Sequence, residues 1–566
     1  MSAHRKIAEK YIFPLLLLIY PLLLIDQGID VTDTTYSLGN YRFMEQMDMT
    51  WVVATWLANV CGRLLMQLPY GDTLLGMNLY TGLVLAAIGL LCYRVLSRWM
   101  PAWCVFLGEM IALGLCWCPT TILYNYLTYL LFAAGSLCLY QGLCSGRDRW
   151  LAAAGVCLGL NVMVRFSNLA EAGLIVTLWY ACWVKKETVI AAIRKTGWCL
   201  AGYLAGFGSA LVWIMAKYGF HAFGDMVSGL FGMSAQASEY TLGGMIRATA
   251  DAYLTALGWL MYAAAVLIGS ILLFLWKKGR WEAGKKVLCC IGLSVLLRLY
   301  WGRGMFSLRY YNEGSVFQWM MLFLILTLVC CVLEIAGYPE EGDRQERKIL
   351  AVLVLMIVLL TPLGSNNYTY QNMNNLFLAA PYTIWTCWRI HKKIGGKQLY
   401  FPVQVFAGVI LLMTLVQGVI FGCTYVFRDG IYGEQRDTRV ENSRVLAGMR
   451  TSAGRAAHLD SLLAFWEKES SGEPVLFWGD VPGLSYILDV PSAIFTTWPE
   501  IPSNTEDSLA AALEGLEEDP DILMGGDLEE QPEEEKWELI RAFIRERGYV
   551  CIFENEDYQV YRAQED

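Results

Sequence analysis

Long apolar runs separated by shorter polar segments dominate the first 424 residues of the chain. A helix that crosses a membrane needs about 20 mostly apolar residues, and thirteen runs come close to that length. The pattern therefore predicts a polytopic α-helical membrane protein with about 13 transmembrane helices. The expected spans are residues 11–28, 73–96, 103–118, 121–143, 151–164, 169–184, 197–216, 253–276, 284–300, 315–336, 348–363, 376–391 and 403–424.

Lys and Arg residues are divided unequally between the two sides that these spans define. If the N-terminus is cytoplasmic, the cytoplasmic segments carry 23 Lys and Arg residues, and the opposite side carries 8 before residue 425. Because cytoplasmic loops carry the excess of positive charge, this ratio favours an odd number of spans and an extracytoplasmic C-terminal region. The outer side then holds the long polar segments, which are residues 26–72, 217–252, 301–314 and 364–375.

The pattern changes after residue 424, where we place the boundary between a transmembrane domain (1–424) and a second domain (425–566). Apolar residues in 440–469 recur at helical spacing, and two short apolar runs further on are typical of buried strands. Residues 549–553 and 558–562 have the composition of strands, and the polar residues 554–557 separate them, as in a β-hairpin. We predict a small α/β domain outside the cytoplasm.

Composition supports the membrane assignment. The chain is 56% hydrophobic and 17% charged, with a mean hydropathy of +0.41, whereas soluble proteins are about 25% charged. These values exclude an ordinary soluble enzyme and a disordered chain. The net charge of −9 combines a balance of +10 in residues 1–424 with −19 in residues 425–566. We expect the bilayer, and no nucleic acid, as a partner.

The first outer segment brings carboxylates to the membrane boundary. Asp26, Asp30 and Asp33 follow the first span, and partial desolvation at such a boundary raises a carboxyl pKa and makes a better base. We favour solvated loop positions for Asp26 and Asp30, and a catalytic role for Asp33. Further on, residues 47–66 have the amphipathic spacing of a helix lying in the membrane surface.

This order of elements resembles the GT-C superfamily of glycosyltransferases, multi-span enzymes that use polyprenyl-phosphate-linked sugars. Residues 33–41 (DTTYSLGNY) are similar to the first-loop motif of its bacterial branch, of the protein O-mannosyltransferase and aminoarabinose-transferase type. Members often carry an Asp-Glu pair where this chain has Asp33-Thr34. The resemblance implies an inverting transfer with Asp33 as base, and we add Tyr36 and Asn40 as candidates for binding sugar or acceptor.

A leaving phosphate needs cations or hydrogen-bond donors, and external Arg residues are scarce in this chain. The segment 300–313 supplies several such groups at the outer side, where Arg binds phosphate with a planar fork and Tyr adds a hydroxyl donor. We therefore predict donor-phosphate binding by Arg303, Arg309, Tyr310 and Tyr311.

Other outer residues have the hydrogen-bonding groups that sugar hydroxyls require. The uncharged segment 364–375 contains Asn366 and Asn367, and Tyr124 and Asn125 lie near the outer end of another span. Amide and hydroxyl groups suit sugar hydroxyls, although a polar turn explains the segment equally well. We expect Arg165 and Glu171 to form a structural ion pair.

The sequence thus predicts an integral-membrane glycosyltransferase that moves a sugar from a polyprenyl-phosphate donor to an extracytoplasmic glycan, lipid or protein acceptor. No cofactor is certain, although Asp30 and Asp33 could hold a divalent metal. The alternative is a transporter or polymerase of lipid-linked sugars or polysaccharide, but the sequence has no internal repeat and no paired broken spans.

Overall fold

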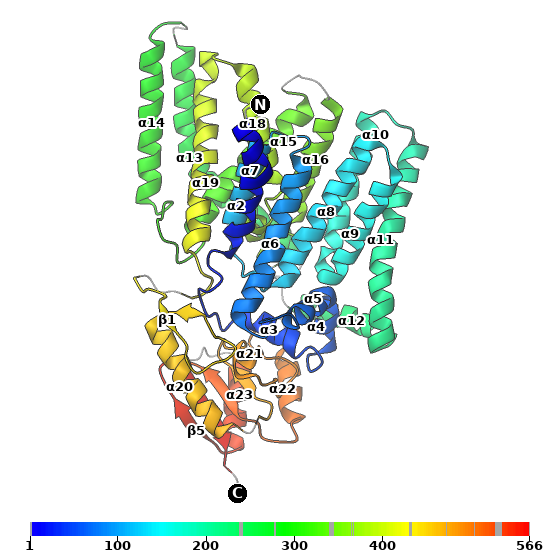
Figure 1. The fold of residues 1–566 in the computed structure, drawn as a ribbon, viewed down its shortest axis with the longest axis vertical. Coiled ribbons are helices and arrows are strands. Elements are labelled where there is room, and N and C mark those ends of the chain that lie inside the picture. Colours follow the sequence, from blue (N-terminus) through cyan, green and yellow to red (C-terminus); the bar gives the residue numbers. More distant parts are fainter. Residues whose placement is uncertain are drawn as a thin grey trace.

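The computed structural model describes residues 3–236, 242–276, 279–338, 344–363, 365, 367–429, 433–470, 472–502, 504–526 and 535–564. Its larger part is a bundle of roughly parallel helices, and a smaller domain lies at the end of the bundle far from the N-terminus (Figure 1). The bundle consists of α1 (Ala3–Ile7), η1 (Ala8–Ile12), α2 (Phe13–Ile19), η2 (Tyr20–Leu22), α6 (Leu74–Leu96), α7 (Ala102–Gly114), α8 (Leu123–Ser145), α9 (Asp148–Val164), η3 (Phe166–Leu174), α10 (Ile175–Val184), α11 (Val189–Tyr218), α12 (Ala222–Gln236), α13 (Leu242–Leu275), α14 (Glu282–Gly302), α15 (Gly314–Ala336), α16 (Arg344–Leu360), α17 (Tyr370–Asn374), α18 (Ala379–Ile394), η5 (Gln398–Tyr400) and α19 (Phe401–Thr424).

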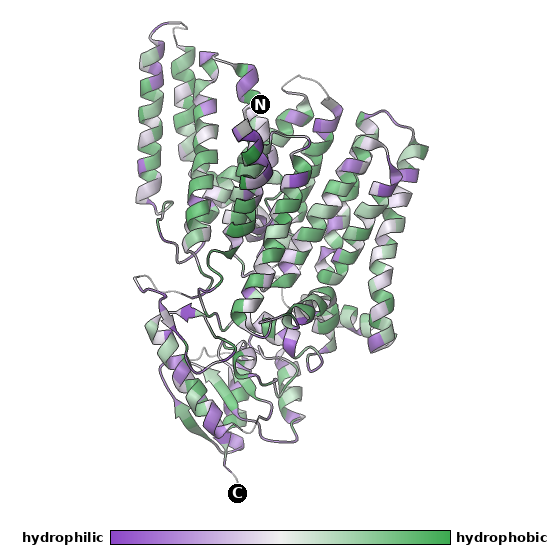
Figure 2. Ribbon diagram, viewed as in Figure 1, coloured by the Kyte–Doolittle hydropathy of each residue, from purple (hydrophilic) through white to green (hydrophobic). Residues whose placement is uncertain are grey.

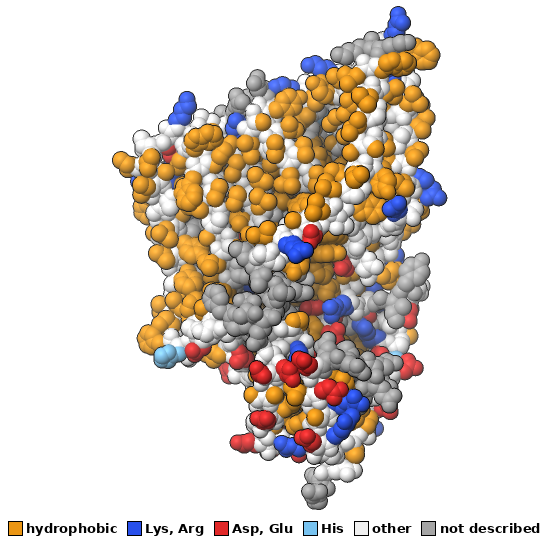
Figure 3. Space-filling view, turned by 180° about the vertical axis from the view of Figure 1, so that it is seen from behind, with side chains coloured by type: hydrophobic (Ala, Val, Ile, Leu, Met, Phe, Trp, Pro, Cys, Tyr) orange, Lys and Arg blue, Asp and Glu red, His pale blue; other side chains and the backbone are white. Residues whose placement is uncertain are grey.

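The chain is a polytopic helical membrane protein. Among the described residues, six helices are long and apolar enough to cross a membrane: Leu74–Leu96, Leu123–Ser145, Val189–Tyr218, Gly243–Leu275, Gly314–Ala336 and Gln398–Thr424. Each of the thirteen expected ranges overlaps a helix, but several of these helices are shorter, so the count of 13 stays a prediction. Hydrophobic residues predominate along the helices of the bundle (Figure 2). Their side chains spread over its surface, and basic side chains lie along the end opposite the acidic small domain (Figure 3).

Glycine allows close packing within the bundle between α9 and α11. A Cβ on Gly155 would lie 2.0 Å from the Cys199 carbonyl oxygen, and one on Gly159 would lie 2.1 Å from the Tyr203 oxygen. Gly202 of α11 approaches the backbone of α9 as closely. Small residues four apart let membrane helices approach in this way.

The first outer segment is more ordered than the sequence predicted. A helix, α3 (Asp33–Arg42), begins at Asp33, in a region expected to be a loop. The helix expected over 47–66 is present as α4 (Met49–Ala54) and α5 (Trp56–Met66), with a break at Thr55. Its position in the membrane surface stays a prediction. All three lie between the bundle and the small domain (Figure 1).

The C-terminal domain is built around a four-stranded sheet in the order β3-β4-β6-β5. β3 and β4 are parallel, and β5 and β6 form the expected hairpin. Its elements are β1 (Thr438–Arg439), β2 (Arg450–Thr451), α20 (Ala453–Glu469), β3 (Leu476–Trp478), α21 (Leu484–Leu488), α22 (Glu506–Glu514), β4 (Ile522–Gly525), α23 (Glu535–Glu546), β5 (Tyr549–Glu554) and β6 (Tyr558–Ala563).

The small domain and the first outer segment share one hydrophobic core. Ile29 and Leu38 belong to the same buried cluster as Leu459 and Phe477. The Gly483 amide donates to the Val31 carbonyl at 2.7 Å. Burial of this shared apolar surface holds the domain against α3.

A buried carboxylate joins the start of this domain to the first outer segment. Asp429 is 2% exposed and accepts hydrogen bonds from the Ile29 amide at 2.6 Å and the Thr451 hydroxyl at 2.9 Å. Arg455 lies 3.5 Å from it. A buried charge needs such partners, and here they come from both parts of the chain.

Candidate functional site

Asp33 stands at the N-terminal end of α3 because a neighbouring carboxylate caps the helix. Asp30 accepts hydrogen bonds from the backbone amides of Thr32 at 2.9 Å and Thr34 at 2.8 Å. Side-chain oxygens that satisfy the first amides of a helix stabilise its start. Asp30 is 4% exposed, which corrects the expectation of a solvated loop residue. Asp26 lies 3.4 Å from Arg450 in an ion pair.

The Asp33 carboxylate is poorly solvated and lies beside one cation. Its side chain is 30% exposed, and Oδ2 is 3.9 Å from Nη1 of Arg428. The same Nη1 lies 3.5 Å from Oδ2 of Asp480, in the C-terminal domain. Burial, followed by the nearby Asp30 charge, raises the pKa of Asp33 to about 6, although Arg428 opposes the rise. Such a carboxylate is a stronger base than a solvated one.

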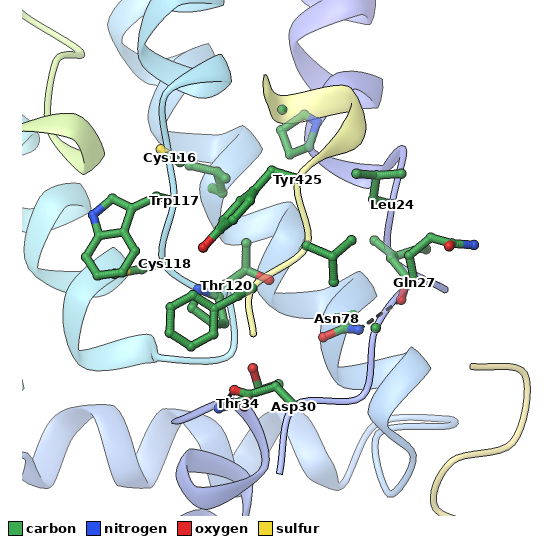
Figure 4. A pocket seen from close by; sticks show the side chains of 18 of the residues that line it. Leu24, Gln27, Asp30, Thr34, Asn78, Cys116, Trp117, Cys118, Thr120 and Tyr425 are labelled. Atoms are coloured by element: carbon green, nitrogen blue, oxygen red, sulfur yellow. Dashed lines mark hydrogen bonds between the residues drawn. The ribbon is translucent and has the colours of Figure 1, made fainter. Parts of the chain in front are cut away.

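A cavity of about 160 Å³ adjoins this end of α3. Asp30 and Thr34 lie at one end of it, and Tyr425 reaches in from the chain after α19 (Figure 4). The turn after η2 and the helix α7 contribute an apolar wall that includes Leu24 and Leu113. An apolar wall with a polar end suits an amphipathic ligand.

The four predicted phosphate-binding residues line a second cavity, of about 510 Å³. Arg303 and Arg309 are exposed, and the Arg309 Nη2 donates to the Glu434 carbonyl at 2.8 Å. Tyr310 is 2% exposed and its hydroxyl donates to Gln417, so its ring supports the cavity from inside the protein. The structure thus brings the Arg and Tyr residues together, but none of them lines the cavity next to Asp30.

The end of α19 lies between the two cavities. On one side, the Tyr310 amide donates to the Thr424 hydroxyl at 3.2 Å. Tyr425 donates to Glu313 at 3.4 Å, also toward the second cavity. On the other side, Arg428 approaches Asp33. Residues 424–428 therefore connect the cationic cavity to the carboxylate.

Tyr36 and Asn40 face the C-terminal domain. Both line a small cleft of about 30 Å³ that also includes Thr496. The Tyr36 ring meets Trp498 edge-on at 5.4 Å between centroids, and burial raises the pKa of the Tyr36 hydroxyl. The structure places both residues on the α3 helix that carries Asp33, one and two turns further on.

Tyr124 and Asn125 both contact Arg165, for which Glu171 was the partner expected from the sequence. Arg165 lies over the Tyr124 ring at 5.4 Å and donates to the Asn125 oxygen at 3.5 Å. Glu171 instead accepts a hydrogen bond from Asn161 at 2.6 Å. The expected pairing of Arg165 with Glu171 is therefore wrong, since both find neutral partners.

Much of the polar segment 364–375 turns inward. The Asn374 oxygen accepts from the Trp117 amide at 2.9 Å, and Gln371 accepts from the Tyr129 hydroxyl. Asn367 is exposed, and its backbone amide donates to the Ser365 hydroxyl at 3.2 Å. Asn366 lies outside the described residues. Buried amides with these partners position the chain between α7 and α8.

Within the described ranges, no group of three or more His, Cys, Asp or Glu side chains is arranged to hold a metal ion. The Asp30 oxygens accept hydrogen bonds from Thr32 and Thr34. A divalent cation between Asp30 and Asp33 would have to share the Asp30 carboxylate with these donors.

Arg428 and Asp480 are the site residues that sequence reasoning missed. Arg428 follows directly after the last apolar run, and Asp480 follows a predicted strand. Their only sequence signal was a charged side chain at the end of an element, which is common on solvated surfaces.

No protein-family model matches the chain, and no curated protein sequence matches it significantly. Thirteen chains of solved structures resemble it in fold. ArnT from Cupriavidus metallidurans, solved bound to undecaprenyl phosphate, is 11% identical with a TM-score of 0.41, over 99% of this chain and 98% of that one. The Archaeoglobus fulgidus oligosaccharyltransferase AglB, solved with an inhibitory peptide and a dolichol-phosphate, is 11% identical with a TM-score of 0.44, over 96% and 73%. Arabinosyltransferase EmbB from Mycobacterium smegmatis is 13% identical with a TM-score of 0.35, over 74% and 42%. Likenesses this distant leave the function to be argued from the site itself.

Proposed function

We propose that the chain is an integral-membrane glycosyltransferase that moves a sugar from a polyprenyl-phosphate donor to an acceptor outside the cytoplasm. The observation that carries the proposal is Asp33. It is a partly buried carboxylate with a pKa of about 6, at the start of the helix α3, which lies between the helix bundle and the C-terminal domain. A carboxylate with that pKa is ionised at neutral pH and still basic enough to take a hydroxyl proton.

In this mechanism, Asp33 removes the proton of the acceptor hydroxyl as the acceptor oxygen attacks the anomeric carbon. The bond from the anomeric carbon to the phosphate oxygen breaks, and its electrons leave with the polyprenyl phosphate. One displacement inverts the anomeric configuration. In this proposal Arg303 and Arg309, which line one cavity with Tyr311, stabilise the charge on the departing phosphate. Because the phosphate and Asp33 must reach the same anomeric carbon, residues 424–428, which lie between the cationic cavity and Asp33, have to move aside when the donor binds.

The remaining candidates bind rather than react. Tyr36 and Asn40 lie on α3 toward the C-terminal domain, on the side from which an acceptor approaches. Tyr124 and Asn125, with Arg165 between them, can position sugar hydroxyls. The N-terminus is cytoplasmic and the C-terminal domain extracytoplasmic in this proposal, supported by the 23-to-8 distribution of basic residues.

Transfer should fall as the pH drops through the pKa of Asp33. The ionised fraction of an acid decreases tenfold for each pH unit below its pKa, so kcat/KM is expected to fall with that slope below about pH 6. The experiment follows release of polyprenyl phosphate from radiolabelled mannosyl and aminoarabinosyl undecaprenyl phosphate by protein in nanodiscs, together with membrane extract as acceptor source. A rate that stays constant down to about pH 4.5 would contradict Asp33 as the base.

Loss of one guanidinium should weaken donor binding. For Arg309→Gln we expect the KM for the lipid donor to rise about tenfold, because a charge-assisted hydrogen bond contributes about 1.5 kcal/mol or more. Arg541→Gln is the matched control, since Arg541 lies on α23 and is 41% exposed. Equal KM values for the two variants would remove Arg309 from the phosphate site.

A further inference from the structure

The C-terminal domain reaches the candidate base through a shared guanidinium. Arg428, in the chain that follows α19, lies 3.9 Å from the Asp33 carboxylate and 3.5 Å from the Asp480 carboxylate. Asp33 belongs to the first outer segment and Asp480 to the turn after β3. One cation therefore lies between two carboxylates from opposite ends of the sequence.

The position of Asp480 is imposed by its turn. Gly479 and Asp480 both have left-handed backbone conformations, with φ of 84° and 62°, and a non-glycine residue adopts that region at a cost. Glu500 holds the turn by accepting hydrogen bonds from the amides of Gly479 and, at 3.4 Å, Asp480. Trp498, two residues before Glu500, contacts Tyr36 on α3. The domain thus presents Asp480 at a defined place beside α3.

We propose that Arg428 and Asp480 are positioning residues for Asp33: Asp480 holds the guanidinium between the two carboxylates, so that the outer domain controls how strongly the base is paired. This inference rests on the proposed function of Asp33. An Arg paired with Asp33 alone would stabilise its ionised form and make it a weaker base. Sharing the cation with Asp480 leaves Asp33 ionised but only partly neutralised.

Apart from Asp480 and Arg428, the groups near Asp33 are unchanged in every variant compared below. Asp30 adds negative charge from the same segment, and Asp480 does so from the C-terminal domain. Tyr36 lies on α3 itself, and Tyr124 and Cys118 face Asp33 from the start of α8 and the chain before it. Within this set, Arg428 is the cation that lowers the pKa of Asp33.

The test measures the protonation of Asp33 directly. Full-length protein in nanodiscs is treated over a range of pH with a water-soluble carbodiimide and glycine methyl ester, which modify protonated carboxyl groups. Mass spectrometry of the Asp33 peptide then gives the pH of half-maximal labelling. For Asp480→Asn we expect this midpoint to fall by about one pH unit, because Arg428 pairs with Asp33 alone and the repulsion from Asp480 is lost. For Arg428→Gln we expect it to rise by about as much, because the attraction of the guanidinium is lost. In the Arg428→Gln background, Asp480→Asn should lower the midpoint by much less, because no guanidinium is left to pair with Asp33.

Shifts of opposite sign distinguish positioning from a structural disturbance, which would move both midpoints the same way. Arg428→Lys keeps the charge and is expected to stay within about half a pH unit of the wild type. Asp480→Ser replaces Asp480→Asn, and Arg428→Met replaces Arg428→Gln, if either variant fails to fold. Unchanged midpoints, or shifts of one sign, would overturn the inference. Because labelling requires no donor or acceptor, the proposed function can fail separately, through absence of transfer with the expected midpoints intact.

Discussion

Replacing Asp33 with Asn will abolish transfer while leaving the protein folded. The amide has the same shape but cannot accept the proton of the acceptor hydroxyl, and positioned general bases contribute about 10²–10⁴-fold to rate. Asp33 is poorly solvated, so a neutral side chain is readily accommodated at its place. We expect kcat to fall by at least about a hundredfold, with an unchanged elution profile and melting temperature.

The control for this variant is Asp26→Asn. Asp26 lies in the same outer segment and pairs with Arg450 at 3.4 Å, where a partly exposed ion pair contributes little to stability. Its replacement removes the same charge without touching the candidate base. If the two variants transferred sugar equally well, Asp33 would not be the base.

Gly483→Ala should loosen the C-terminal domain from the first outer segment. A Cβ at this position would lie 1.8 Å from the Thr35 hydroxyl and 2.6 Å from the Val31 carbonyl oxygen. Both belong to the loop and helix that carry Asp33, and they cannot both move away without disturbing α3. Overpacking of this kind costs about 2 kcal/mol, so we expect a lower melting temperature and a large loss of transfer activity.

Limited proteolysis measures this loosening directly. Arg436 donates to the carbonyls of Thr424 and Asp429, each at 2.9 Å, which protects the connection after α19 from trypsin. Faster cleavage at Arg436 is expected in Gly483→Ala. Gly454→Ala is the matched control, since a Cβ there meets nothing within 4 Å. Equal cleavage rates in both variants would show that this contact does not hold the domain.

The position of Asp33 just after the first span could be predicted, because it depends only on the order of residues along the chain. The end of the first apolar run locates the membrane boundary, and the nearest polar cluster follows it. The helix α3 could not be predicted, because its start depends on how the Asp30 side chain folds back on the amides of Thr32 and Thr34. The same carboxylates are equally consistent with a solvated loop.

Partners distant in sequence account for the other differences. Arg428 approaches Asp33 from the chain that follows α19, and no local pattern encodes a contact between residues so far apart in sequence. Asn374 was expected in an outer loop, but its oxygen binds the Trp117 amide. Uncharged amides suit a solvated turn and a buried network equally well, so composition alone could not separate the two.

The most direct test of the central claim is native mass spectrometry of the lipid that co-purifies with the wild type and with Asp33→Asn. A transferase that cannot activate its acceptor retains its donor, so we predict a bound polyprenyl-phosphate sugar in the variant. The wild type, which completes transfer, should instead carry polyprenyl phosphate without the sugar. The finding that neither protein binds a polyprenyl lipid, or that both carry the same species in equal amounts, would contradict the account.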